Sequence, residues 1–164
     1  GFILICSVLV LGAFGMRETE KQESLPEPKF VVELCRFTFY SALDDGHKPG
    51  DKLFGVAFSG LKLIPYQTIA VDLKYWSEKF SLPYDPKAKQ TERAKSPVFY
   101  HMMFLDLENQ KVYRAVDIGG GVKKSTLDLF TGFDEKARQE ARSKGKQYRK
   151  MMVVYYPEDT NAAR

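Results

Sequence analysis

Residues 98–118 read VFYHMMFLDLENQKVYRAVDI, and this stretch decides the architecture. Its two halves, 98–107 and 111–118, are rich in β-branched, aromatic and aliphatic residues, which favour strands. The polar residues 108–110 separate the halves, and a connection of this length suits antiparallel pairing. The sequence therefore predicts a β-hairpin, around which the rest of the domain is arranged.

Four further segments have strand-like patterns of apolar residues. The clearest is 69–75, where every second residue is apolar, so that Tyr75 is expected inside and Trp76 outside. The side chains of 54, 56 and 58 and those of 69, 71 and 73 are expected to form two buried faces. The four predicted strands are 30–40, 54–58, 69–75 and 151–156.

One helix is predicted near the end of the chain. Thr131 suits an N-cap, and the acidic Asp134 three residues later suits a capping box. Phe133, Ala137 and Ala141 then repeat every four residues, and the helix is expected to run to about Tyr148. The predicted fold is α+β: a mostly antiparallel sheet of about six strands, sandwich or barrel-like, with one C-terminal helix.

The first sixteen residues, GFILICSVLVLGAFGM, contain no charge. Residues 1–15 are read as a signal peptide, with small residues Ala13 and Gly15 before a cut at Met16, or as a retained membrane anchor. A buried core element is the third reading. We expect a polar linker at 16–29, a single globular domain at 30–157 and a tail at 158–164. The domain is then extracytoplasmic, periplasmic or secreted, or else membrane-anchored through residues 1–15.

Sequence motifs nominate no catalytic, cofactor or metal site. Residues 119–126, GGGVKKST, lack the phosphate-loop spacing because Val122 stands between the last glycine and the lysine. His47 and His101 match no zinc or calcium pattern. Only Cys35 remains after a cut at Met16, so no internal disulfide is expected. Carboxylate pairs are possible, but no pattern selects one.

The net charge of +4 invites a nucleic-acid reading, but its distribution opposes it. Residues 134–150 hold seven basic and three acidic side chains, and this segment alone accounts for the whole excess. A charge run on a helix is usually a solvated face. We therefore expect no nucleic-acid partner.

A long basic loop, 83–97, follows a cluster of aromatic residues. Exposed aromatic side chains beside basic ones are typical of interaction surfaces. The sequence thus favours a non-enzymatic extracytoplasmic module that engages a protein partner, of an envelope, inhibitor-like or immunity-like kind. Its membrane contact would be through residues 1–15 only. The predicted binding residues are Trp76, Tyr84, Lys87, Lys89, Arg93 and Lys95.

Two other functions stay open. A barrel lined by Phe54, Phe58, Met102 and Phe104 could carry a small apolar ligand. An enzyme with an unrecognised site is the other alternative, and a deep pocket that holds His101 or a carboxylate pair with perturbed ionisation would favour it.

Overall fold

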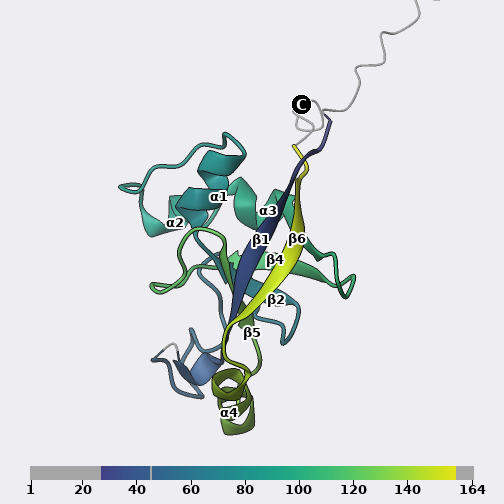
Figure 1. Ribbon diagram of the computed structural model, residues 1–164. Helices are drawn as coiled ribbons and strands as arrows, with labels where there is room; N and C mark the ends of the chain where they lie inside the picture. The colour runs from purple at the N-terminus through teal and green to yellow at the C-terminus, as the bar shows by residue number, and fades with distance from the viewer. Residues whose placement is uncertain (1–26, 45, 158–164) are drawn as a thin grey trace, which may run out of the picture.

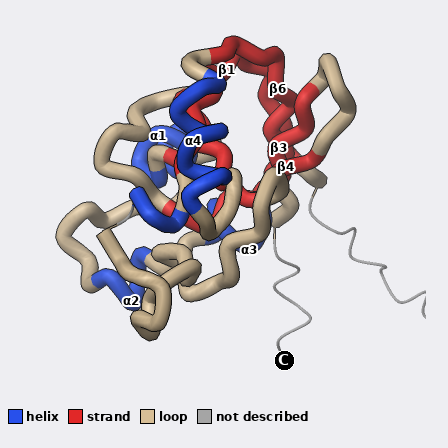
Figure 2. Tube along the Cα trace, turned by 90° about the horizontal axis from the view of Figure 1, so that it is seen from below, coloured by secondary structure: helices blue, strands red, loops and turns tan. Residues whose placement is uncertain are grey.

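The computed structural model describes residues 27–44 and 46–157. Over these residues six strands close into a barrel in the order β1-β5-β2-β4-β3-β6 (Figures 1 and 2). This confirms an α+β fold built on a barrel. The expected signal or anchor segment and the C-terminal tail lie outside the described residues, and the domain boundaries stay predictions. The strands are β1 (Lys29–Tyr40), β2 (Thr68–Val71), β3 (Met102–Asp106), β4 (Val112–Asp117), β5 (Thr126–Phe130) and β6 (Gln147–Tyr155).

The barrel is a mixed sheet, so the expectation of a mostly antiparallel sheet holds only in part. Strands β1 and β5 pair in parallel, as do β2 and β4, while the other four neighbouring pairs are antiparallel. Parallel neighbours need long crossover connections. The stretch of chain between β1 and β5 and the stretch between β2 and β4 supply them, and they hold most of the short helices (Figure 1).

The predicted hairpin is present, but its first half is shorter than expected. Strands β3 and β4 pair antiparallel, with Phe104 opposite Tyr113. Residues before β3 form the helix α3 (Pro97–His101) instead of a strand. Ser96 caps this helix by accepting a hydrogen bond from the N–H of Val98 at 3.3 Å, and a proline at the first helical position is preorganised for a helix start.

The segment 69–75 is half strand and half helix, which corrects the predicted position of Trp76. Strand β2 ends at Val71, and Asp72 caps the helix α1 (Leu73–Lys79) by accepting a hydrogen bond from the Tyr75 N–H at 3.2 Å. The helical turn directs Trp76 into the core, where it is 0% exposed. Its ring meets that of Phe104 edge-on at 5.2 Å.

Residues 54–58 do not form the predicted strand. They lie in a series of turns after the short 3-10 helix η1 (Ala42–Asp44), and the segment makes a single bridge between Val56 and Lys62. Val56 is 39% exposed, so the expected buried face is wrong at this position. The segment packs instead on the outer side of the barrel wall, in a second apolar cluster of Tyr40, Ala42, Ala57, Leu63, Ala70, Val116, Val122 and Phe130.

The C-terminal helix is shorter than predicted. Helix α4 (Glu135–Lys144) begins at Asp134, which caps it at 2.8 Å from the Ala137 N–H, and ends at Gly145 with a positive φ of 62°. The short helix α2 (Gln90–Arg93) interrupts the long loop. In the described part of the chain, no helix has the length and apolar character needed to cross a bilayer.

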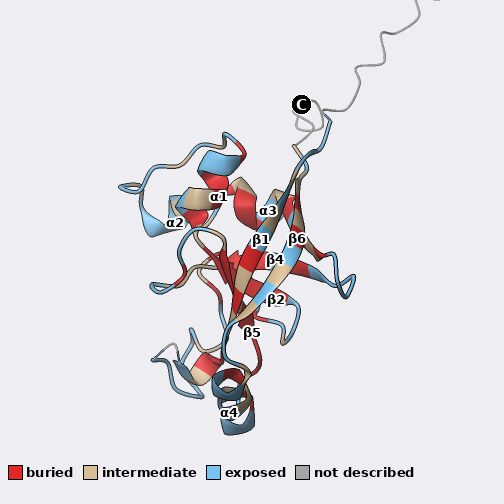
Figure 3. Ribbon diagram, in the orientation of Figure 1, coloured by how far each residue is buried: buried red, intermediate tan, exposed pale blue. Residues whose placement is uncertain are grey.

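The barrel interior is a packed core that also contains one ion pair. Asp106, 0% exposed, accepts a hydrogen bond from the Arg149 guanidinium at 3.1 Å. The guanidinium also donates to the Tyr113 hydroxyl at 3.1 Å and lies 4.6 Å from the centre of the Phe37 ring. Buried apolar residues surround this pair, including Cys35, Ile69, Val71, Ala115, Leu127, Leu129, Met151 and Val153 (Figure 3).

Replacing Val71 by alanine is expected to lower the free energy of unfolding by about 2 kcal/mol, because it removes two methyl groups from a closed core. Val71 is 1% exposed, and the matched change Val56→Ala, on an exposed side chain, is expected to cost less than about 0.5 kcal/mol. Urea unfolding of both variants measures the difference. Equal costs for the two variants would contradict the strand register described here.

Candidate active site

Two carboxyl groups are aligned on one wall of the barrel. Ala70, on β2, stands opposite Asp128 of β5 on one side and opposite Asp117 of β4 on the other. Thr38, on β1, continues the row beyond Asp128. Neighbouring strands lie about 4.8 Å apart, so the two aspartates stand about 10 Å apart across the small Ala70. We call Thr38, Asp128, Ala70 and Asp117 the carboxyl row.

Asp117 is held by three hydrogen bonds. Its Oδ1 accepts from the backbone N–H groups of Phe58 at 2.8 Å and Ile118 at 2.9 Å, and its Oδ2 accepts from the Tyr40 hydroxyl at 3.2 Å. Burial raises the pKa of Asp117 above the usual aspartate value, and the three donors act in the opposite direction. Because every donor stabilises the ionised form, Asp117 is suited to remain a carboxylate.

Asp128 has a poorer environment for a negative charge. Its Oδ1 accepts one hydrogen bond, from the Thr38 hydroxyl at 2.7 Å. Burial raises the pKa of Asp128, and the nearby negative charges of Asp44 and Asp117 raise it further. Since like charges and burial both favour the protonated form, Asp128 is the better proton donor of the pair.

The two carboxyl groups therefore have different tasks available to them. Asp117 and Asp128 are both half-buried. A pair of carboxyl groups whose surroundings separate their ionisation is the usual signature of a general acid and a general base. In the described ranges, no group of three or more histidine, cysteine, aspartate and glutamate side chains is arranged to hold a metal ion.

Asp128→Asn is expected to raise the free energy of unfolding by about 1 kcal/mol at neutral pH, because it removes a charge from an unfavourable site. The raised pKa of Asp128 means that its ionised form costs stability above that pKa, and the cost disappears as the pH falls through it. The gain of the asparagine variant should therefore fade on acidification. Thermal melts of the parent and the variant at neutral and acidic pH measure it. A gain in the free energy of unfolding that is unchanged at low pH would contradict the raised pKa of Asp128.

Sequence reasoning did not find the carboxyl row. It did not predict β5, and it gave no reason to pair Asp117 with Asp128. One signal was present: aspartate is depleted in strands, yet Asp128 lies between Leu127 and Leu129 in an alternating apolar pattern. An acidic residue that interrupts such a pattern marks a position where charge is retained for a reason other than packing.

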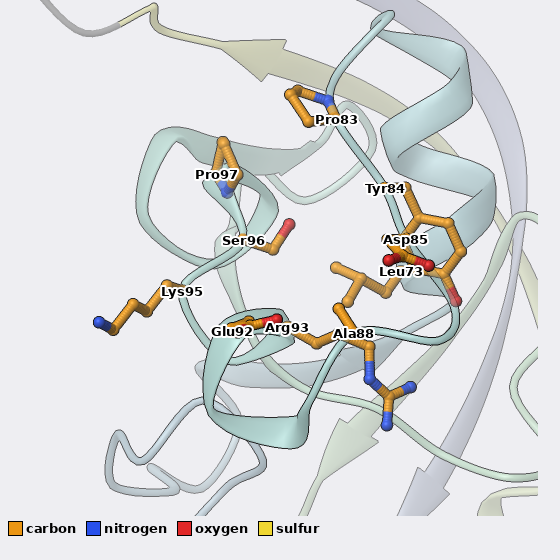
Figure 4. Close-up of a pocket in the computed structure, with 10 residues that line it drawn as sticks. All are labelled: Leu73, Pro83, Tyr84, Asp85, Ala88, Glu92, Arg93, Lys95, Ser96 and Pro97. Carbon is orange, nitrogen blue, oxygen red and sulfur yellow. The ribbon is translucent and has the colours of Figure 1, made fainter.

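The predicted binding residues are only partly brought together. Tyr84, Arg93 and Lys95 line a cavity of about 380 Å³ between α1 and the loop 83–97 (Figure 4). Figure 4 shows the Lys95 side chain directed away from this cavity. Trp76 lies in the core instead, and Lys87 and Lys89 are exposed but do not line the cavity. The remaining lining residues are Leu73, Pro83, Asp85, Ala88, Glu92, Ser96 and Pro97.

One residue, Phe58, connects a residue that lines this loop cavity with the carboxyl row. The Arg93 guanidinium lies 5.3 Å from the centre of the Phe58 ring, and the backbone N–H of Phe58 holds Asp117. The four residues expected to line a ligand-carrying barrel are not gathered in one place. Phe104 belongs to the packed interior, whereas Phe54 packs against the outer cluster.

No protein-family model matches the chain, and no curated protein matches it in sequence. Among solved structures, the chain is similar to part of the lytic transglycosylase LtgG of Burkholderia pseudomallei, with 17% identity over 63% of this chain and 27% of that one, and a TM-score of 0.39. A membrane-bound lytic murein transglycosylase from Agrobacterium tumefaciens gives 15% identity, 66% and 28% coverage, and a TM-score of 0.40.

An expansin of Clavibacter michiganensis gives 14% identity over 79% of this chain and 52% of that one, with a TM-score of 0.40. The chain thus spans little more than a quarter of the transglycosylases and about half of the expansin. At this level of similarity, the chemical argument rests on the carboxyl row.

The expectation of a non-enzymatic module for a protein partner is wrong. The structures that the barrel resembles are lytic transglycosylases and an expansin, not protein-binding modules. The physical basis of the expectation also fails, because its aromatic anchor, Trp76, is buried and offers nothing to a partner. The remaining loop residues keep their predicted binding role only as a prediction.

Proposed function

We propose that the chain is an acid–base enzyme that cleaves a glycosidic bond, with Asp128 as the proton donor and Asp117 as the proton acceptor. The carboxyl row is the observation that carries this proposal. It consists of two half-buried carboxyl groups, both with a raised pKa, of which Asp117 has three hydrogen-bond donors and Asp128 one. Cleavage of a glycosidic bond ordinarily uses such a pair, one on each side of the bond.

The proposed step is a proton-assisted displacement. Asp128 gives its proton to the oxygen of the scissile bond, and the carbon–oxygen bond breaks with its electron pair on that oxygen. An attacking hydroxyl, from water or from the sugar itself, forms the new bond to the carbon. Its proton passes to Asp117. Thr38 and Tyr40 keep the two carboxyl groups in place through their hydroxyl groups.

The separation of the two aspartates suits this role. With one strand between them, the two aspartates are farther apart than a pair on adjacent strands. A wide separation is typical of glycosidases in which a hydroxyl attacks directly, without a covalent intermediate. The fixed position of the Asp117 carboxylate also matters, because preorganised hydrogen bonds avoid rearrangement during the reaction.

We place this activity outside the cytoplasm, and the uncharged residues 1–16 support that location. The substrate class we propose is a cell-wall glycan. Murein, the polymer named for the Agrobacterium protein, is the first substrate to test.

The experiment incubates the full chain with purified murein and, separately, with other insoluble and soluble polysaccharides. Released sugars are separated by chromatography and weighed by mass spectrometry. Soluble products are expected. A product heavier by one water indicates hydrolysis, and a product without added water indicates attack by a hydroxyl of the sugar itself. A chain that is folded yet releases no sugar from any glycan contradicts the proposal.

A further inference from the structure

One outer wall of the barrel carries almost only apolar side chains. It is formed by β1, β6, β3 and β4, where alternate residues point away from the core. The strand register arranges these residues in three rows. We call them the apolar face: Phe30, Val154 and Met103 in the first row, Val32, Met152, Leu105 and Val112 in the second, and Leu34 and Leu107 beside Lys150 in the third.

The apolar face is accessible to solvent. Phe30 is 66% exposed, Leu34 62% and Val112 52%. Figure 3 shows exposed and intermediate colours alternating with buried ones along β1 and β6. From the strand and residue spacings, the face measures about 15 by 20 Å. A contiguous apolar surface of this size on a soluble domain marks an interaction site with a protein or a membrane.

Positive charge borders this face at one end. Lys150 lies in the third row opposite Leu34, and Arg36 follows opposite the exposed Tyr148. Within the described residues, neither Lys150 nor Arg36 forms an ion pair with a carboxylate. Apolar side chains bordered by free cations and a tyrosine are the composition of a surface that contacts lipid headgroups.

We propose that the apolar face docks on the surface of a bilayer that contains anionic lipids. The chain itself argues for lipid. Residues 1–16 are uncharged, and the twelve residues 17–28 that join them to β1 reach at most about 40 Å.

Residues 1–16 and the apolar face can both contribute to membrane binding. A single weak lipid signal gives marginal, reversible membrane binding, and stable attachment takes a second one. Residues 1–16 provide one apolar element and the apolar face provides another. Phe30, the second residue of β1, belongs to the face, so the face begins where the linker ends.

Docking through this face fixes the orientation of the barrel. Strand β6, the centre of the apolar face, is three positions from β2 in either direction around the barrel. The carboxyl row is centred on β2, so it lies on the opposite wall. A barrel seated on its apolar face therefore presents the two carboxyl groups away from the lipid.

The test uses a tryptophan reporter in the full chain. The native Trp76 is buried and contributes a constant background. Val32→Trp places a reporter in the centre of the apolar face, and Lys62→Trp places a matched one on the opposite side, in the segment that covers the outer cluster. Each variant is mixed with vesicles of equal parts phosphatidylcholine and phosphatidylglycerol, with and without bromine on the acyl chains.

We expect brominated vesicles to quench the Val32→Trp emission about twofold and to leave the Lys62→Trp emission unchanged. Lys150→Glu in the same background, or high salt, should weaken the quenching. If brominated vesicles bind the chain but quench the two reporters to the same extent, the proposal is overturned, because residues 1–16 alone would then hold the protein. A second result would also overturn the proposal. If the chain sediments as a dimer without vesicles, and the Val32→Trp side chain is then shielded from solvent, a second copy of the chain covers the face.

Discussion

Asp128→Asn is expected to lower the initial rate of glycan cleavage by about 10²–10⁴-fold, the usual contribution of a general acid. Asparagine keeps the shape of the side chain and can still accept the Thr38 hydrogen bond, but it has no proton to donate to the leaving oxygen. Chromatographic assay of released sugars, at one substrate concentration and several pH values, measures the loss.

The pH dependence of the parent's cleavage rate also tests the assignment of Asp128 as the acid and Asp117 as the base. Because Asp128 acts protonated, the rate should fall as the pH rises through its raised pKa. Because Asp117 acts ionised, the rate should also fall as the pH drops through the pKa of Asp117, which burial raises. The asparagine variant should lose the alkaline limb of this profile.

Glu78→Gln is the matched control, since Glu78 is an exposed helical carboxylate that pairs with Lys74. It should keep the parent rate, and the melting curve of each variant shows whether the protein is folded. An asparagine variant that is folded and as active as Glu78→Gln would remove Asp128 from the proposed role.

Asp106→Ala is expected to lower the free energy of unfolding by about 3–5 kcal/mol. The substitution leaves the Arg149 guanidinium inside the barrel without its counter-charge, and Asp106 also accepts the backbone N–H of Glu108 at 2.9 Å. A loss of this size is a large part of the stability of a typical domain. Urea unfolding followed by circular dichroism measures it.

A double variant separates the charge from the packing. Asp106→Leu with Arg149→Met removes both charges and keeps most of the volume, and it should recover much of the stability that either single change loses. A double variant as unstable as the sum of the single ones would mean that the pair contributes through packing alone.

The parts of the fold that depend on local pattern could be predicted. Strand β1 and the hairpin of β3 with β4 are rich in β-branched, aromatic and aliphatic residues, and a short polar turn fixes the hairpin. The same reasoning failed in the segment 69–75, because a helix cap lies within it. Asp72 begins a helix where the apolar alternation appeared to continue, and this single cap moved Trp76 from the surface to the core.

The candidate site could not be predicted, because no local pattern contains it. Thr38, Ala70, Asp117 and Asp128 come from four strands that are separated along the chain by other elements. Only the register of two parallel pairings and one antiparallel pairing, with a bulge between Ile69 and Ala70, aligns them. The interior ion pair could not be predicted either, because Asp106 and Arg149 are 43 residues apart in the sequence and come together only when the barrel closes.

Closure of the barrel also determines when the protein folds during its synthesis. Strand β1 is the first strand made, yet both of its neighbours, β5 and β6, are among the last. A nascent chain on the ribosome therefore keeps β1 unpaired until residues 126–155 have emerged, and contacts so distant in sequence form slowly. The unpaired apolar strand is prone to aggregation during that interval, and a ribosome stalled before β6 would display a chain without a barrel.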